Sequence, residues 1–197
     1  CHRSHASVVG VPNMLPSGAG LLLQREVDNL DKVLKNPVRP FLVVIGGMKV
    51  QTKVKFIDRI LKIADSVIIG GLIKKELMKN VKYRFSRKMM GPKENLDALD
   101  IDKKTIHAFR QKILSAKTIL WNGPFGRFED EAYKNGTFQI AKAIKESGAF
   151  SVVGGGETVE FLTKEGLLSN FSHVSTGGGA MLAYLAGEEL PGLKALN

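Results

Sequence analysis

Two hydrophobic periods alternate along the chain. Apolar residues recur at helical spacing over residues 21–35, and prolines follow closely, which predicts a long helix. Residues 41–47 (FLVVIGG) then form a short continuous apolar run rich in branched side chains, which is typical of a strand covered on both faces of a parallel sheet. Helical spacing returns over residues 54–64, and residues 66–71 (SVIIGG) repeat the strand pattern. The first half of the chain therefore predicts helices that alternate with strands.

The second half repeats this order. The pattern predicts a helix at 103–116, a strand at 117–124, a helix at 131–148, a strand running into a turn at 150–158, a short helix at 158–166, and a last strand, glycine triplet and helix within 172–190. Strands that alternate with helices at this spacing are joined by right-handed crossovers. We therefore expect an α/β protein with a doubly wound parallel sheet, a Rossmann-like three-layer sandwich, in one domain.

Two stretches interrupt the alternation. Residues 72–99 contain no convincing strand, and we predict part helix and part loop there. Residues 1–20 carry several prolines and glycines without clear periodicity, which predicts a loop that leads into the first long helix. The predicted domain therefore covers residues 21–197, including the helix at 21–35.

Composition and charge narrow the class of protein. The formal net charge is +10, and the stretch from Lys74 to Lys93 holds eight basic residues against one acid, Glu76. Such an excess favours an anionic partner such as a nucleotide, a phosphate ester or a nucleic acid. The single cysteine, Cys1, excludes an intrachain disulfide framework and multi-cysteine zinc sites. Because no apolar stretch is long enough for a membrane helix and no signal peptide is recognisable, we expect a cytoplasmic location.

Glycine clusters follow the predicted strands, and ligands of doubly wound sheets bind at the carboxyl ends of strands. In GGMKVQTK, Gly46 and Gly47 precede Lys49 and Lys53, so backbone N–H groups and two lysines one turn apart are candidates for a phosphate chain. The alternative is a tight turn with two solvated lysines. The motif is not a Walker loop, because it lacks the required glycine and Ser/Thr spacing.

Two further clusters suggest a pocket rim and an anion site. WNGPFGRFE (121–129) leaves a strand through a turn that could hold Asn122 and Glu129 at a rim, where an amide and a carboxylate suit sugar hydroxyls; the alternative is a purely structural turn. GGGETVE (154–160) places glycines before a helix whose first turn holds Glu157 and Thr158, a pairing that suits a magnesium-bound polyphosphate. A helix cap with close glycine packing is the alternative there.

Two motifs lie near the ends of the chain. STGGGA (175–180) repeats the glycine-before-helix design. CHRSH places His2, Arg3 and His5 close together, which suits recognition of an anionic substrate better than a metal, although such a cluster is also typical of a solvated terminus.

Taken in order, these motifs resemble the phosphoglycerate kinase family along the whole chain. The matching segments are HRSHAS, RPFLVVIGGMKV, SVIIGG, ALDI, KTILWNGPFGRFE, VVGGGETVE and SHVSTGGGAMLAYLAGEELPG. In that family an N-terminal lobe binds 3-phosphoglycerate and a C-terminal lobe binds magnesium ATP or ADP. The resemblance implies that this chain is the nucleotide-binding lobe, with residues 1–20 as the hinge segment between the lobes.

The resemblance also implies roles for individual residues. Lys49 and Lys53 resemble lysines at the nucleotide phosphates, and Arg3 resembles a residue that reaches the substrate phosphate, with His2 and His5 nearby. The implied catalytic residues are Arg3, Lys53, Gly156 and Gly179; the implied nucleotide-binding residues are Gly46, Gly47, Lys49, Lys53, Gly70, Gly71, Leu99, Asn122, Pro124, Glu129, Gly155, Gly156, Glu157 and Thr158. Glu157 takes the family's acidic position for Mg²⁺, where aspartate is usual.

The implied reaction is reversible phosphoryl transfer between 1,3-bisphosphoglycerate and ADP, which yields 3-phosphoglycerate and ATP in glycolysis, carried out by a monomer. Because the resemblance begins within the HRSH motif, we expect the substrate lobe to be missing and this piece alone to be inactive. We also expect residues 72–99 to be several dozen residues shorter than in the family, which affects the adenine pocket. Two alternatives remain: a degenerate lobe that acts as a binding module, and a nucleic-acid-binding domain based on the basic segment with Tyr83 and Phe85.

Overall fold

The fold is a single parallel sheet between two layers of helices. A computed structural model describes residues 1–196. The sheet has six strands in the order β3-β2-β1-β4-β5-β6, and every pair of neighbours is parallel. The strands are β1 (Phe41–Ile45), β2 (Ser66–Ile69), β3 (Met89–Met90), β4 (Thr118–Asn122), β5 (Phe150–Gly154) and β6 (His173–Val174). This confirms the predicted doubly wound α/β sheet.

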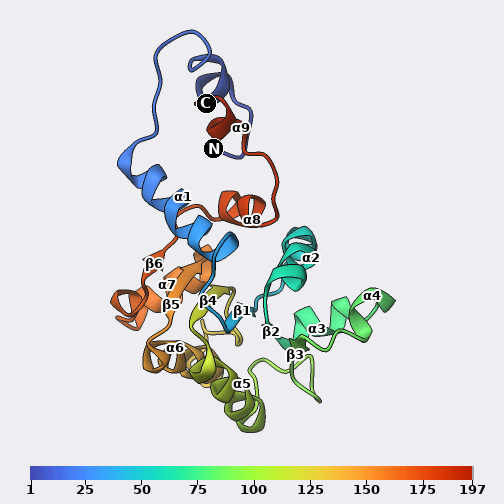
Figure 1. Ribbon diagram of the computed structural model, residues 1–197. Helices are drawn as coiled ribbons and strands as arrows, with labels where there is room; N and C mark the ends of the chain where they lie inside the picture. Colours follow the sequence, from blue (N-terminus) through green and yellow to red (C-terminus); the bar gives the residue numbers. More distant parts are fainter. Residues whose placement is uncertain (197) are drawn as a thin grey trace.

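Helices connect the strands and cover both faces of the sheet (Figure 1). They are α1 (Leu21–Leu34), α2 (Val54–Ile63), α3 (Gly71–Leu77), α4 (Val81–Arg84), α5 (Lys103–Ser115), α6 (Asn135–Ser147), α7 (Gly156–Lys164), α8 (Gly179–Leu185) and α9 (Pro191–Lys194). Short helical turns occur at Ala6–Gly10, Gln51–Lys53, Glu131–Tyr133 and Leu168–Asn170. The two long helices α5 and α6 pack together on one face, and α1, α2 and α8 cover the other.

Alternate residues of the central strands supply two separate cores. In β1, Leu42 and Val44 pack toward α5 and α6, whereas Phe41, Val43 and Ile45 pack toward α1, α2 and α8. All five side chains are buried. The continuous apolar run in the sequence thus reflects a strand that is covered on both sides.

Two predictions about irregular segments need correction. Residues 72–99 contain a strand after all: Met89 and Met90 pair with Val67 and Ile68 at the edge of the sheet. A strand of two residues is too short to produce an apolar run, and so periodicity did not reveal it. In residues 1–20, the expected loop includes one helical turn, Ala6–Gly10, which packs beside α9. The backbone N–H of Gly192 donates to the carbonyl of Cys1 at 2.9 Å, so the two ends of the chain lie together (Figure 1).

Candidate functional site

The glycine clusters gather at the carboxyl-terminal end of the sheet because they follow parallel strands that run in the same direction. Gly46, Gly123 and Gly155 directly follow β1, β4 and β5, which are neighbours in the sheet. At Gly123, φ is +96°, and an added Cβ would lie 2.2 Å from the Gly46 carbonyl oxygen. Only glycine permits this backbone approach. The prediction that the glycine turns after the strands meet at one end of the sheet is confirmed for these three turns.

The backbone N–H groups of Gly46 and Gly47 were predicted to bind a phosphate chain, but both donate hydrogen bonds within the protein. The Gly46 N–H donates to the Asn122 carbonyl at 3.0 Å, and the Gly47 N–H donates to the Pro124 carbonyl at 2.7 Å. The Gly123 N–H donates to the Thr158 hydroxyl at 2.8 Å. These bonds tie the ends of the strands together. Amides that could meet an anion are those in the first turn of α7, which begins after Gly155, a residue with no side chain to cap them.

The Lys53 side chain is buried at this carboxyl-terminal end of the sheet. It is 6% exposed, and its ammonium donates to the Gly46 carbonyl at 2.6 Å. Burial lowers the pKa of the Lys53 ammonium to about 8, against an opposing effect of the Glu157 carboxylate. A Cβ added at Gly47 would lie 3.2 Å from Lys53 Nζ and 3.6 Å from Glu157 Oε2. A positive and a negative group therefore approach the same point beside Gly47.

Three other predicted residues differ from Lys53 and Glu157 in their settings. Lys49 is exposed and precedes the first helical turn, which starts at Gln51, so it does not share a helical face with Lys53. Asn122 is 3% exposed and donates to the Gly154 carbonyl at 3.0 Å. The prediction that Asn122 lies at a pocket rim is therefore wrong, because the last residue of β4 lies between β1 and β5. Thr158 is fully buried and accepts the bond from Gly123.

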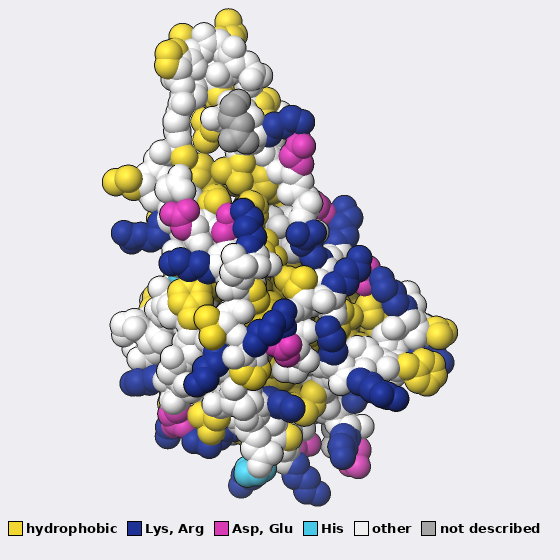
Figure 2. All heavy atoms as spheres, in the orientation of Figure 1, with side chains coloured by type: hydrophobic (Ala, Val, Ile, Leu, Met, Phe, Trp, Pro, Cys, Tyr) yellow, Lys and Arg dark blue, Asp and Glu magenta, His cyan; other side chains and the backbone are white. Residues whose placement is uncertain are grey.

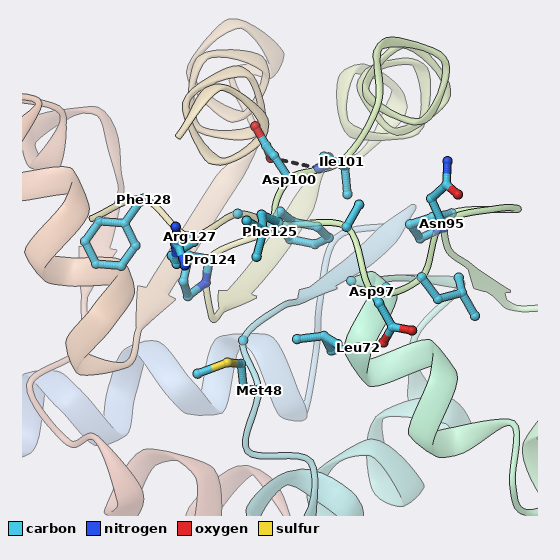
Figure 3. A pocket seen from close by; sticks show the side chains of 18 of the residues that line it. Met48, Leu72, Asn95, Asp97, Asp100, Ile101, Pro124, Phe125, Arg127 and Phe128 are labelled. Atoms are coloured by element: carbon cyan, nitrogen blue, oxygen red, sulfur yellow. Dashed lines mark hydrogen bonds between the residues drawn. The ribbon is translucent and has the colours of Figure 1, made fainter. Parts of the chain in front are cut away.

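A pocket of about 510 Å³ opens at the carboxyl ends of β1, β2 and β4. Seven predicted residues line it, namely Gly47, Gly70, Gly71, Leu99, Pro124, Glu129 and Glu157. Figure 3 shows the ring of Phe125 at its centre, with Leu72 and Met48 facing it from the other side. Phe128 and Arg127 continue the wall toward α7. The lining is thus apolar over the middle of the pocket, with charged residues at the end near Glu157 and acidic residues along residues 94–102.

The sequence reasoning missed the apolar residues of this pocket and most of one wall. Leu72, Phe125 and Phe128 follow strands β2 and β4, as the predicted residues do, but their apolar side chains resemble core residues in the sequence. The missed wall is the strap, which we define as residues 91–102; the nine residues Glu94 to Asp102 line the pocket without a gap, and of these only Leu99 was predicted. The signals for the strap were the segment ALDI at its end and its composition of glycine, proline, asparagine and acids.

The second glycine triplet lies at the neighbouring strand end. Gly177 and Gly178 follow β6, and α8 begins at Gly179. A Cβ added at Gly179 would lie 3.3 Å from His2 Nε2. His2 therefore lies against the start of α8, while Arg3 and His5 are exposed beside it in the chain. The fold thus brings the first residues of the chain to the glycine triplet, 177 residues later.

The basic segment carries only part of the aromatic and cationic face that nucleic-acid binding would use, because Phe85 is 81% exposed but Tyr83 is buried. Tyr83 is 3% exposed, and its hydroxyl donates to Asp58 at 2.7 Å, so this ring cannot stack on a base. Lys75, Lys79 and Lys82 each form an ion pair with a carboxylate of the protein. Figure 2 shows basic side chains spread over much of the visible face rather than gathered on this segment.

Two features are absent from the described residues. Within residues 1–196, no group of three His, Cys, Asp or Glu side chains could hold a metal ion. None of the helices in this part of the chain is both long and apolar enough to cross a bilayer.

Comparisons with known proteins agree with this geometry. The family model described as phosphoglycerate kinase matches residues 1–98 and 86–188. The chain belongs to the phosphoglycerate kinase family. The phosphoglycerate kinase of Rubrobacter xylanophilus is 39% identical over 238 residues, which cover 99% of this chain and 61% of that protein. That of Finegoldia magna is 36% identical over 242 residues, 100% of this chain and 61% of that protein.

Solved structures of phosphoglycerate kinases have the same fold. The enzyme from Coxiella burnetii superposes with a TM-score of 0.89 at 32% identity, over 99% of this chain and 62% of that one. The enzyme from Pyrococcus horikoshii OT3 gives 0.86 at 33% identity, over 99% and 61%. This chain therefore spans about 61% of the length of the phosphoglycerate kinases that it matches.

The comparisons also support the predicted shortening. The alignment with the Rubrobacter phosphoglycerate kinase has 238 positions, whereas this chain has 197 residues, so at least 41 positions have no counterpart here. The two matches to the family model meet and overlap at residues 86–98. This overlap indicates that the shortened region falls at β3 and the strap.

Proposed function

We propose that this chain is the nucleotide-binding lobe of a phosphoglycerate kinase and binds magnesium ADP or ATP in the pocket at the strand ends. One observation carries the proposal: an apolar slot around Phe125 leads to Gly47 and to Glu157 in the first turn of α7, and the buried Lys53 ammonium lies directly behind Gly47. A nucleotide has the matching sequence of groups, since its base is flat and largely apolar and its phosphates are anionic. Leu72 and Leu99 border the base, and Glu129 at the rim is available to a ribose hydroxyl.

The charged end of the pocket is suited to the phosphates. The Lys53 ammonium is protonated below its pKa of about 8 and neutralises part of the phosphate charge. The N–H groups of Gly156 and Glu157 in the first turn of α7 add the positive end of a helix dipole. Because these groups are held in place before the ligand arrives, they need no reorganisation when charge moves.

Glu157 fits a magnesium ion of the kind that nucleotides bring with them. Mg²⁺ is commonly held by one or two carboxylates, with phosphate oxygens and water completing an octahedron. One exposed carboxylate beside Lys53 meets this requirement, and a site made of three protein ligands is not needed. The bound ion neutralises charge on the phosphate oxygens.

The reaction we assign to the whole enzyme is the transfer of a phosphoryl group from the acyl phosphate of 1,3-bisphosphoglycerate to the β-phosphate of ADP. The P–O bond to the carboxylate breaks, and a P–O bond to ADP forms, so 3-phosphoglycerate and ATP result and no covalent enzyme intermediate is required. Lys53, the start of α7 and the glycine triplet 177–179 would hold the moving phosphoryl group, and Arg3 with His2 and His5 would face the substrate. The substrate lobe lies outside this chain, so we expect the isolated chain not to turn over.

Calorimetric titration with magnesium ADP, together with thermal unfolding, tests the nucleotide site. We expect saturable binding and a melting temperature that rises with ligand concentration, since a ligand that binds only the native state stabilises it. Phe125→Asp provides the matched variant, because it places a charge in the apolar slot. If the wild type gives no heat and no shift, the chain is a degenerate lobe, and the proposal fails.

A further inference from the structure

The strap, residues 91–102, forms one wall of the pocket without a regular element of its own. Between the end of β3 at Met90 and the start of α5 at Lys103, the backbone passes through bends and turns, and Asn95 adopts a left-handed φ of 50°. This chain is shorter than the relative to which it aligns, and the two family-model matches overlap in this region. A short wall without helix or strand must be held by contacts with its neighbours.

Two consecutive lysines of α3 hold the first half of the strap. Lys74 donates to the Pro92 carbonyl at 2.5 Å. Lys75 donates to both oxygens of Asp97, at 2.7 Å and 2.6 Å. At the first residue of α3, an added Cβ on Gly71 would lie 2.4 Å from the Leu96 carbonyl oxygen. The strap therefore rests directly on the start of α3, and the lysines fasten it there.

The second half of the strap is fastened differently, through the backbone and one carboxylate. The Arg127 N–H donates to the Leu99 carbonyl at 2.8 Å. Asp100 accepts from the N–H of Ile101 and from the N–H of Gly136, each at 2.8 Å. Figure 3 shows the Asp100–Ile101 bond on the α6 side of the pocket and Asp97 on the α3 side. The two halves are therefore anchored to opposite walls.

The Lys75–Asp97 pair lies in an unusual place for an ion pair of its kind. Its side chains are 52% and 65% exposed, so the pair contributes little to global stability. Yet Asp97 lines the pocket, and five more acids line it as well, namely Glu94, Asp100, Asp102, Glu129 and Glu157. Without Lys75, the uncompensated Asp97 would add to the negative charge around a polyanionic ligand.

We propose that Lys75 is a positioning residue of the nucleotide pocket: it fastens the shortened strap over the base end and neutralises Asp97. This inference rests on the proposed function, because the nucleotide is the ligand that the strap would cover. Lys75 itself does not line the pocket; it acts on the ligand through Asp97 and the strap.

The test compares Lys75→Ala with Lys79→Ala, which removes another exposed lysine four residues further along, paired with Glu76 instead of the strap. We expect Lys75→Ala to raise the Kd for magnesium ADP about fivefold, the scale of a strong exposed ion pair, with an unchanged melting temperature of the ligand-free protein. Lys79→Ala should leave both values unchanged. Asp97→Ala should have a smaller effect, about twofold, because it loses the anchor without leaving an unpaired carboxylate.

Two further measurements separate anchoring from charge and from global stability. The deficit of Lys75→Ala should shrink as salt rises, because exposed charges are screened, and Lys75→Arg should restore most of the affinity. Amide hydrogen exchange in the strap of the ligand-free protein should quicken in Lys75→Ala and not in Lys79→Ala.

The outcomes are distinguishable from failure of the proposed function. If the wild type binds magnesium ADP and Lys75→Ala binds it equally well, the positioning role is wrong while the proposed function stands. If the wild type does not bind, the proposed function fails and the neutralisation of a ligand-facing carboxylate falls with it. Equal exchange rates in Lys75→Ala and Lys79→Ala overturn the anchoring in either case.

Discussion

The two ends of the pocket are built by different means. We call the end at Lys53, Gly47 and Glu157 the phosphate end and the end between Leu72 and the strap the base end, after the groups of the proposed nucleotide. At the phosphate end, hydrogen bonds of buried groups join the loops after β1 and β4 to each other and to α7, and the buried Lys53 ammonium donates to the Gly46 carbonyl. At the base end, the strap is an irregular segment held by exposed lysines and by Asp100. A substitution at the first end disturbs the sheet itself, whereas one at the second end disturbs a wall. This difference explains how this chain can be shorter than its relatives at the strap and still keep the six-stranded sheet.

The largest expected effect is on turnover, at the phosphate end. Lys53→Met can be assayed in a chimera that joins this chain to the part of the Rubrobacter phosphoglycerate kinase that it does not cover. We expect kcat to fall on the order of 10³-fold, as when one preorganised charge-stabilising donor is removed, and KM for ADP to change far less. Lys55→Met, an exposed neighbour paired with Glu188, is the control. A kcat within twofold of the control would remove Lys53 from the phosphoryl-transfer step.

The burial of Lys53 predicts a pH dependence of stability that the base end does not share. The unfolded chain holds the Lys53 proton up to a pKa of 10.5, whereas the folded chain releases it at about 8. Between these values the unfolded state binds more protons, so stability rises with pH. The contribution is about 3 kcal/mol over the whole window. We expect the urea-derived unfolding free energy of the wild type to rise by this amount relative to Lys53→Met.

Lys55→Met controls this comparison, because other groups titrate in the same range. Burial and the Asp58 carboxylate raise the pKa of Tyr83 to about 12, and the difference between variants cancels this contribution. A difference that stays flat from pH 7 to pH 10 would mean that Lys53 is solvated and charged like an ordinary surface lysine.

At the base end, the strongest anchor is the Asp100 carboxylate. Asp100→Ala leaves the amide of Gly136 without its acceptor at a tightly packed place, where a Cβ on Gly136 would lie 2.1 Å from the Asp100 carboxylate. We expect a loss of about 2 kcal/mol in the free energy of unfolding, measured by urea denaturation. Asp102→Ala, which removes the N-cap of α5 beside it, is the control and should cost about 1 kcal/mol. A loss at Asp100 no larger than at Asp102 would show that the strap does not depend on this carboxylate.

The sequence predicted the phosphate end better than the base end, for a physical reason. An apolar run followed by glycines marks the end of a strand in the sequence, and this pattern also identifies nearby residues such as Lys53 and Glu157. What the corner amides bond to depends on partners about 76 residues away, as with Gly46 and Asn122, and no local pattern reports this. At the base end, Lys75 and Asp97 are 22 residues apart across a strand of two residues. Their pairing follows from the fold and not from periodicity.

The smallest effect that sharpens the comparison concerns Glu157, the one predicted metal ligand. Glu157→Gln keeps the size of the side chain and removes its charge. We expect magnesium-dependent ADP affinity to weaken about tenfold, in proportion to the loss of one hard oxygen ligand. Affinity for ADP without magnesium should rise instead, because a negative group beside the phosphates is gone. Isothermal titration with and without Mg²⁺ measures both.

The opposite signs make this test decisive for the charged end of the pocket. Glu160→Gln is the matched control, since Glu160 lies one turn further along α7 and is paired with Lys164. If Glu157 only props the corner through packing, both affinities should move together in Glu157→Gln. If it holds the metal, they should diverge, and the phosphate end would then combine a buried cation with a carboxylate that acts through magnesium.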